Sequence, residues 1–535
     1  MWLLDRFKNL LLVLFFLAPA GVAFFLVQSL AIEGEADFTF VNQGEVASLD
    51  PAISTAFSEG RIITALFEGL VTLDPVTLEP RPGVAERWEF TADGRVYTFF
   101  LREDARWSDG TPLTAGDFLF SWRRFLAPET AAPYAYFLWS VVEGAEAYSK
   151  GLRGGETALG LAAPDARTFI VRLRAPCPFF LYLVAIYPLC PVDRRCIEEH
   201  GEKEWLKPEK IVSNGPFRVR ERRIKDRIRL EKNLHYWDSQ QVALDTIDAL
   251  AVESPITALN LYLTGDVDWI NVVPPIAIAD LRERPDFSEA LNLGTNFLRF
   301  NTTCAPLEKK AVRRAIHLAI DRRELVDGVL KGDQTPATSF VPPGIPGYKP
   351  ACVAGCEPSA ARVALARAGY SAGEGFPELR LLYSMGETNR DLAEVIAMQL
   401  RRHLGIRVHP ASQERKVYFL SQSTLDYDIV LCSWVGDYLD PSNFLEVFAS
   451  GSGNNRTGWG SAGYDALLQS AASEMDTERR AGLLAEAETI LLEALPITPL
   501  YYRTTTNMIK TCWEGYADNL LDVHPLKYLR RSGGS

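Results

Sequence analysis

The sequence predicts an α/β protein with more than one domain. The chain has 535 residues, which is longer than one hydrophobic core usually supports. Its hydrophobic content of 47% and aromatic content of 11% suit a globular protein. Segments with the hydrophobic pattern of strands alternate along the chain with segments that have the pattern of helices. We therefore expect two or three domains that contain both strands and helices.

The predicted strands are short runs of apolar or alternating residues. Tyr97, Phe99 and Leu101 show the clearest alternation, with the period of two that places every second side chain on one face. A Ser-Asp-Gly-Thr-Pro turn follows at 108–112, where each residue type favours a turn. Strands are predicted at 37–42, 97–101, 168–173, 227–230, 296–301, 379–383 and 427–432.

The predicted helices have apolar residues at helical spacing. They lie at 311–330, 359–367, 389–404 and 477–494. Asp321 and Arg322 fall inside the first of them, so we expect its periodicity to bend at that point.

The overall charge excludes some classes of partner. The net charge of −12 argues against nucleic acid or an anionic membrane surface as the main partner. No run of lysine and arginine is long enough to bind a row of phosphates.

Residues 1–36 differ in composition from the rest of the chain. Arg6 and Lys8 precede an uncharged run at 9–32, which is typical of a secretory signal or of an N-terminal membrane anchor. Both alternatives place the body of the protein outside the cytoplasm.

The eight cysteines leave two alternatives open. Cys352 and Cys356 are the pair closest in sequence and either form a disulfide, which export would permit, or remain buried thiols. The six histidines do not cluster around any cysteine pair, so we expect no metal site and no cofactor. Neither a GxSxG nor an HExxH motif is present, which argues against an enzyme.

Several ordered sequence blocks identify a family resemblance. They are LFEGL at 66–70, PGVAERWE at 82–89, RWSDGTPLTAGDF at 106–118, SNGPF at 213–217, LAIDRRELV at 318–326 and WVGDYLDPSNF at 434–444. In order and spacing, the chain from about 41 to 528 resembles the peptide-binding subfamily, within family 5, of the extracytoplasmic solute-binding proteins that serve ABC importers.

The resemblance implies a two-lobed periplasmic-binding-protein fold of class II, with an extra domain in the first lobe and a hinge beside a ligand cleft. It implies a discontinuous domain I at 37–67, 193–293 and 505–535, domain II at 68–192 and domain III, the second lobe, at 294–504. The hinge would lie near Gly294 and Thr505, and we expect a monomer that closes around its ligand.

The resemblance also implies a ligand site after the strand at 427–432. Asp437 matches the aspartate that accepts the α-ammonium group of a bound peptide, a charge-assisted hydrogen bond. Trp434 would offer an apolar wall, and Val435 and Gly436 would keep the backbone open for pairing with an extended ligand. Asp440 is better interpreted as the start of a turn or helix.

Two further ligand contacts are implied by matching positions. Tyr134 matches a tyrosine that touches the peptide from domain II, and Phe57 matches a loop residue whose backbone pairs with the peptide. Ordinary core packing is the alternative for both.

The chain departs from the family pattern at three positions that bind ligand carboxylates. Leu431, Leu330 and Asn389 stand where the family has arginine, lysine and histidine, although Lys331 and Arg390 are neighbours. A preference for short peptides with a free carboxylate is therefore not expected.

The predicted function is an extracytoplasmic receptor that delivers oligopeptides to the permease subunits of an ABC importer. The same module binding another solute (a cell-wall peptide, an oligosaccharide or a metal chelate) and a membrane-anchored sensor or scaffold remain alternatives.

Overall fold

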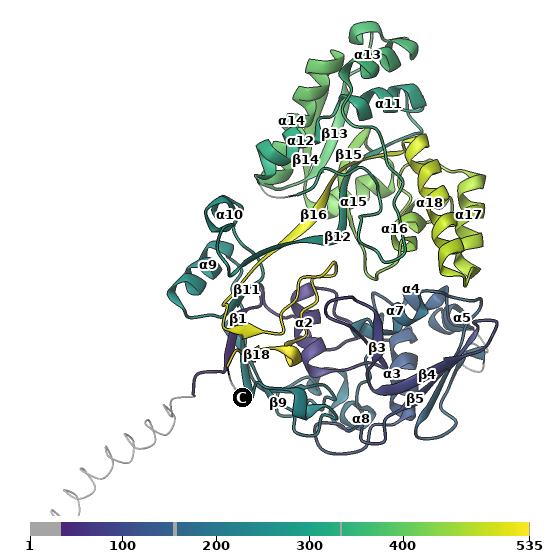
Figure 1. Cartoon of the computed structure of the whole chain (residues 1–535). Helices are drawn as coiled ribbons and strands as arrows, with labels where there is room; N and C mark the ends of the chain where they lie inside the picture. Colours follow the sequence, from purple (N-terminus) through teal and green to yellow (C-terminus); the bar gives the residue numbers. More distant parts are fainter. Residues whose placement is uncertain (1–33, 153–157, 332–333, 534–535) are drawn as a thin grey trace, which may run out of the picture.

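The computed structural model describes residues 34–152, 158–331 and 334–533, which form two lobes joined by two long strands (Figure 1). Most of the segment predicted at 1–36 to direct export lies outside the described residues. Within the described ranges, no helix is both long and apolar enough to cross a bilayer.

A ten-stranded sheet runs through both lobes. Its strands, in spatial order, are β14 (Val408–Gln413), β13 (Leu379–Ser384), β15 (Ile429–Val435), β12 (Phe287–Phe300), β16 (Ile497–Ile509), β11 (Trp269–Ile270), β1 (Phe38–Val41), β10 (Thr246–Leu250), β9 (Arg227–Lys232) and β8 (Phe217–Arg223). The first three strands of this order belong to the second lobe and the last five to the first lobe, with β12 and β16 between them (Figure 1).

The two connecting strands are antiparallel partners with two register shifts, the second of which lies between Asn296 and Phe297. The register of β12 against β16 shifts between Leu291 and Thr295. Within this interval, the N–H of Leu293 donates to the carbonyl of Leu520 at 2.6 Å, so the C-terminal segment replaces the strand partner there.

The first lobe adds a second sheet of four strands. These are β4 (Ala85–Phe90), β5 (Val96–Leu101), β7 (Thr168–Arg172) and β6 (Leu161–Ala162). A short hairpin of β2 (Val71–Leu73) and β3 (Pro80–Pro82) leads toward the second lobe. The helices of this lobe are α2 (Phe57–Leu66), α3 (Ala115–Leu126), α4 (Tyr136–Trp139), α5 (Ala145–Ser149), α7 (Phe180–Val184), α8 (Arg194–Glu204), α9 (Pro255–Thr264) and α10 (Pro275–Leu281). Trp107, Trp122 and Trp205 are almost fully buried in its main core.

The second lobe has a separate hydrophobic core on each face of its sheet. One face is covered by α11 (Lys310–Ala319), α13 (Pro358–Arg367) and α14 (Glu387–Leu404). The other is covered by α15 (Arg415–Ser423), α16 (Ser442–Leu445), α17 (Ala462–Ser473) and α18 (Thr477–Ala494). This arrangement explains why β13 and the first four residues of β15 are almost continuously buried.

Most of the predicted elements are confirmed, with three corrections. The helix predicted at 311–330 is not continuous: α11 ends at Ala319, and the carboxylate of Asp321 accepts the N–H groups of Arg323 and Glu324 to start α12 (Arg322–Leu325). A π-helical turn, η3 (Val326–Leu330), follows. The strand predicted at 427–432 extends to Val435, because β15 pairs with β12 up to that residue. The strand predicted at 296–301 begins at Phe287, because β12 already pairs with β16 from that residue on.

The cysteines are all free thiols in the described structure. Cys352 is exposed and Cys356 is partly buried, so they form neither the predicted disulfide nor a fully buried pair. Across the described ranges, no group of three or more histidine, cysteine, aspartate or glutamate side chains is arranged to hold a metal ion.

Candidate functional site

The predicted site begins on β15, where that strand leaves the second lobe. β15 pairs with β12 along its whole length, but its pairing with β13 stops at Val430. In the described chain, the other edge of β15 beyond Val430 therefore has no strand partner. The hydroxyl of Tyr418 donates to the carbonyl of Leu431 at 2.6 Å, so only the part of this edge after Leu431 is a candidate for pairing with an extended ligand.

Three predicted residues follow in sequence. Trp434 is half-buried, and its Nε1–H donates to Oδ1 of Asn443 at 3.1 Å, which fixes the indole at the end of the strand. Val435 pairs with Gly294 across β12, so one edge of its backbone is already occupied. The N–H of Gly436 donates to the carbonyl of Leu293 at 2.7 Å. This donor is therefore already occupied, contrary to the expectation that it would be open to a ligand.

A different reason accounts for glycine at position 436. A Cβ atom there would lie 2.6 Å from Cδ2 of Leu293 and 3.1 Å from the ring of Phe444. The absent side chain therefore lets the segment before Asp437 pack directly on β12.

Asp437 is the main polar group of the candidate site. Its side chain is exposed, yet surrounding protein removes enough water to raise the pKa of the carboxyl group to about 6. Among the described residues, no cation pairs with this carboxylate and no group donates a hydrogen bond to it. A carboxylate in this condition is suited to a cationic ligand group.

Tyrosines of the first lobe lie near Asp437. Burial raises the pKa of Tyr134, and the charge of Asp437 adds to this effect. The two predicted residues therefore lie close enough for the charge of one to act on the other. Burial and Asp437 also raise the pKa values of Tyr136 and Tyr187. Sequence reasoning missed these two tyrosines, although the aromatic run at 134–139 was a signal for Tyr136.

Phe57 lies at the start of α2, and not in an extended loop. Its side chain is 72% exposed, so it does not belong to the core. As the first helical residue it has an N–H without a partner inside the helix. The hydroxyl of Tyr187 donates to the carbonyl of Ser54 at 2.9 Å, which connects the start of α2 with the tyrosines near Asp437.

The residues after Asp437 join the two lobes. The ring of Tyr438 stacks on Phe179 of the first lobe with centroids 5.1 Å apart. Leu78, in the turn between β2 and β3, is buried in the core of the second lobe. Asp440 accepts the N–H of Ser442 at the start of α16 and forms a buried ion pair with Arg480 at 2.7 Å, which confirms its predicted role at a helix start.

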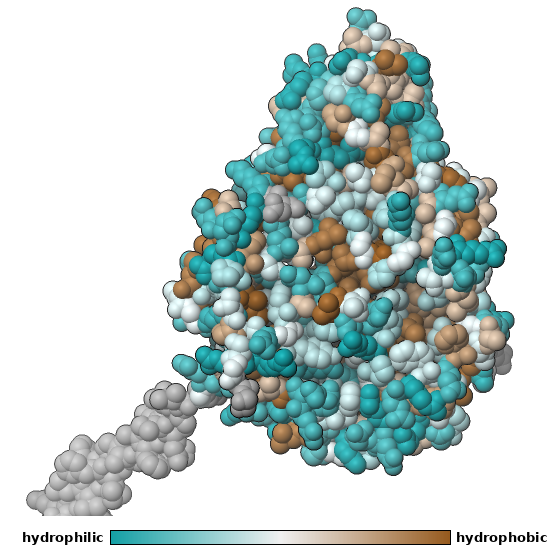
Figure 2. All heavy atoms as spheres, in the orientation of Figure 1, coloured by the Kyte–Doolittle hydropathy of each residue, from teal (hydrophilic) through white to brown (hydrophobic). Residues whose placement is uncertain are grey.

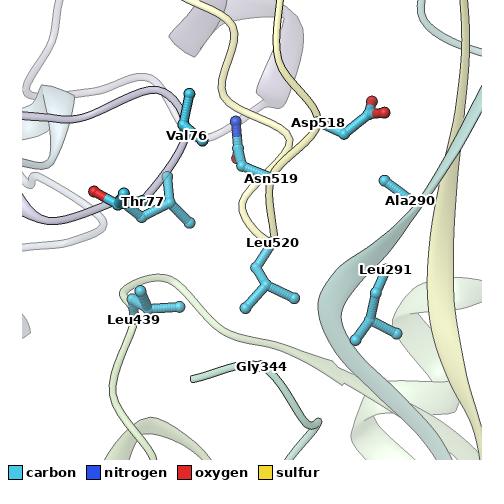
Figure 3. Close-up of a pocket in the computed structure, with 10 residues that line it drawn as sticks. Val76, Thr77, Ala290, Leu291, Gly344, Leu439, Asp518, Asn519 and Leu520 are labelled. Carbon is cyan, nitrogen blue, oxygen red and sulfur yellow. The ribbon is translucent and has the colours of Figure 1, made fainter. Parts of the chain in front are cut away.

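A cavity of about 290 Å³ lies beside these contacts (Figure 3). Both lobes and the connecting strand contribute to it, through Val76, Thr77, Leu78, Ala290, Leu291, Gly344, Leu439, Asp518, Asn519 and Leu520. Hydrophobic side chains also gather between the lobes on the face shown in Figure 2. None of the six predicted site residues lines this cavity, so it marks the seam between the lobes and not the surroundings of Asp437.

The three positions without cations have structural roles. Leu431 is buried in the core, Leu330 ends η3, and the amide of Asn389 donates to the carbonyl of Ser384 at 2.9 Å. The neighbouring Arg390 is exposed and is paired with Asp391 at 2.9 Å.

Comparison with known proteins decides the family. The family model of the bacterial extracellular solute-binding proteins, family 5 (middle region), matches residues 79–456. The chain belongs to this family. It is 34% identical to the periplasmic murein peptide-binding protein MppA of Escherichia coli over 490 residues, which cover 89% of each chain. It is 31% identical to the oligopeptide-binding protein OppA of Bacillus subtilis over 474 residues, 86% of each chain. It is also 33% identical to the probable deoxycholate-binding periplasmic protein YgiS of E. coli over 493 residues, 90% of each chain.

Solved structures agree with this assignment. The unliganded open form of the murein tripeptide-binding protein MppA matches with a TM-score of 0.81 and 33% identity, covering 92% of this chain and 96% of that one. Haemophilus influenzae OppA in complex with the peptide RPPGFSPFR matches with a TM-score of 0.74 and 30% identity, covering 93% and 100%. The predicted two-lobed class II fold is confirmed, and this family 5 protein is a binding protein and not an enzyme.

Proposed function

We propose that this protein is a periplasmic receptor that binds oligopeptides between its lobes and delivers them to the permease of an ABC importer. Relatives named for murein peptides and oligopeptides support a peptide ligand. The observation that carries the proposal is Asp437, a desolvated carboxylate without a cationic partner, which faces tyrosines of the opposite lobe.

In this proposal, Asp437 accepts the α-ammonium group of the peptide. The ligand charge supplies the partner that the described protein lacks, which offsets the cost of desolvating the carboxylate. The first ligand residues then lie against Trp434 and Tyr134, and the free edge of β15 pairs with the ligand backbone.

The domain boundaries given above are part of the proposal. Separate cores in the two lobes and the irregular interval of β12 support a hinge near Gly294. Ligand binding would close the lobes around this hinge.

The test compares free and N-acetylated tetrapeptides by calorimetry on the wild-type protein and on Asp437→Asn. We expect the free-amine peptides to bind the wild type more tightly, and Asp437→Asn to lose roughly 1.5–3 kcal/mol of this affinity. Acetylated peptides should bind both proteins equally weakly. Equal binding of acetylated and free peptides to the wild type would exclude Asp437 as the ammonium site.

A second candidate ligand is an apolar solute without an amine. The similarity to a probable deoxycholate-binding protein favours it, and the cavity between the lobes offers both apolar and polar side chains to such a ligand. If deoxycholate binds with an affinity that Asp437→Asn does not change, and no peptide binds, this candidate replaces the peptide.

A further inference from the structure

Each lobe buries a side chain of the other. Leu78, in the turn between β2 and β3 of the first lobe, is 2% exposed and packs in a core of the second lobe. Tyr438, which follows β15 in the second lobe, is 6% exposed and packs in the main core of the first lobe. Because the insertion is reciprocal, separating the lobes would expose apolar surface on both of them.

Aromatic contacts hold the inserted ring of Tyr438. It stacks on Phe179 with 5.1 Å between the centroids and an angle of 9° between the planes. Phe137, also of the first lobe, meets the same ring edge-on at 6.2 Å. Aromatic pairs in these two geometries contribute stability beyond the apolar area that they bury.

A cation of the second lobe also contacts the ring of Phe179. The guanidinium carbon of Arg480 lies 5.6 Å from the centroid of that ring. Two hydrogen bonds from Arg480 to the carboxylate of Asp440, at 2.7 and 2.8 Å, fix the guanidinium in place. The attraction between cation and ring therefore requires little further ordering of the arginine side chain.

A second contact lies nearer the surface. Met475, between α17 and α18 of the second lobe, is 38% exposed. It packs against the turn between β4 and β5 of the first lobe, where a Cβ atom on Gly94 would lie 3.1 Å from its sulfur and 3.4 Å from Pro176. The contact between the lobes thus continues from the buried rings to the solvent-exposed edge.

These contacts are separate from the strands that connect the lobes. In Figure 3, Leu439 and Thr77 lie across the cavity of about 290 Å³ from Ala290 and Leu291 of β12. Leu439 follows Tyr438 directly, and Thr77 precedes Leu78. The reciprocal insertion is therefore a second attachment of the lobes, in addition to β12 and β16.

The side chains of this attachment form an interlobe clamp, which consists of Leu78, Phe179, Tyr438, Arg480 and Met475. We propose that the clamp limits how far the lobes separate in the free receptor. It consists of protein side chains alone, so a ligand is not needed to form it. Each ligand then meets lobes that are already close together, and less of its binding free energy is used to bring them together. This inference rests on the two-lobed fold and holds for whichever solute the receptor binds.

The test uses two measurements on the protein without ligand. Small-angle scattering gives the radius of gyration, and mass spectrometry gives the rate at which iodoacetamide alkylates Cys177. This thiol is 5% exposed and lies near the second lobe, since burial and then the charge of Asp440 raise its pKa. Cys190 is the internal control: it is 7% exposed, and the charge that acts on it, Glu68, belongs to the first lobe.

Three variants are compared with the wild type. Phe179→Ala removes the ring between the lobes, and Met475→Ala removes the contact at the edge. Phe376→Ala is the matched control, because Phe376 pairs with Tyr370 at 4.9 Å within the second lobe. Thermal unfolding verifies that each variant is folded at the temperature of the measurement. If Phe179→Ala does not fold, the more exposed Met475→Ala decides the outcome.

We expect Phe179→Ala to have a larger radius of gyration than the wild type. The alkylation rate of Cys177 relative to Cys190 should rise by about two- to ten-fold, which corresponds to the contribution of an aromatic pair. Met475→Ala should change both quantities in the same direction by less, and Phe376→Ala should change neither.

Calorimetry with tetra-alanine amide, in its free-amine and N-acetylated forms, adds a measurement of binding. Phe179→Ala should weaken both forms by the same factor, because a smaller fraction of the receptor is ready to bind. The ratio between the two forms should stay that of the wild type, in contrast to Asp437→Asn.

An unchanged radius of gyration in both clamp variants would overturn the inference, even if Cys177 reacted faster, since the clamp would then be only a local cover. An equal increase in Phe376→Ala would overturn it too. Failure of the tetrapeptide to bind the wild type would contradict the proposed function, and scattering and alkylation without ligand would still decide whether the clamp exists.

Discussion

At the scale of single residues, the candidate site is defined by a carboxylate that lacks a partner within the described protein. Asp437 is exposed, and its charge acts on tyrosines of the first lobe. Most of the other buried charges are neutralised locally, as in the pair of Asp440 and Arg480. The contrast separates groups that stabilise the fold from groups that are available to a ligand.

The raised pKa of Asp437 predicts a pH dependence of binding. Only the ionised carboxylate pairs with an ammonium group, and the pKa of about 6 means that protonation begins just below neutral pH. Affinity for a free-amine peptide should therefore be highest near pH 7, fall as the pH decreases through 6, and also fall toward pH 8, where the ligand's α-ammonium group (pKa about 8) begins to lose its proton. Calorimetry between pH 5 and pH 8 measures this change.

Asp437→Asn provides the control for that pH profile. The neutral side chain does not titrate, so affinity of this variant should stay nearly flat over the same range. A wild-type profile that falls in the same way as that of the variant would assign the titration to another group, such as Glu446, whose pKa burial raises to about 7.

At the scale of elements, the close approach of Gly436 to β12 predicts a loss of stability on substitution. In Gly436→Ala, the new methyl group would overlap Leu293 and Phe444, so we expect a loss of about 1–3 kcal/mol in the free energy of unfolding. Urea unfolding measures it. Because Asp437 follows directly, peptide affinity should also fall.

Gly482 is the matched control for this substitution. It lies within α18, is exposed, and has no atom within 4 Å of an added Cβ. Gly482→Ala should therefore be neutral or stabilise the protein by up to about 1 kcal/mol, because alanine favours the helix. A similar loss in both variants would show that the contact with β12 is not responsible.

The elements also show what sequence patterns can and cannot predict. The alternation at Tyr97–Leu101 predicts β5 well, because one face of that strand is buried and the other is not. Residues 287–291 of β12 carry no such alternation, since this part pairs between the lobes and is only partly buried. Asp321 shows how one cap divides an otherwise periodic helix.

Residues of the candidate site could be predicted from the sequence only where they belong to a local sequence motif. The motif around Trp434 and Asp437 predicts a ligand site at the end of β15, and the ligand contacts of these residues stay a prediction. Tyr187 comes from a distant segment and approaches Asp437 only through the packing of whole elements. No local pattern marks such residues as neighbours.

At the scale of the whole molecule, the two lobes predict a change of shape on binding. A receptor whose ligand contacts lie on both lobes gains most from the ligand when the lobes approach each other. Small-angle scattering with a saturating peptide should give a smaller radius of gyration than scattering without ligand. An unchanged scattering curve under saturation would indicate a rigid scaffold, and Asp437→Asn without bound peptide is the matched control.

The replacement of a strand partner by the C-terminal segment has a mechanical consequence. Leu520 receives hydrogen bonds from Asn292 and Leu293, although Asn292 and Leu520 are 228 positions apart, and Asn519 holds the turn after β2 through the carbonyl of Pro75. The connection between the lobes is thus reinforced by a segment that follows both connecting strands in the sequence. Its stiffness depends on these contacts in addition to the pairing of β12 with β16.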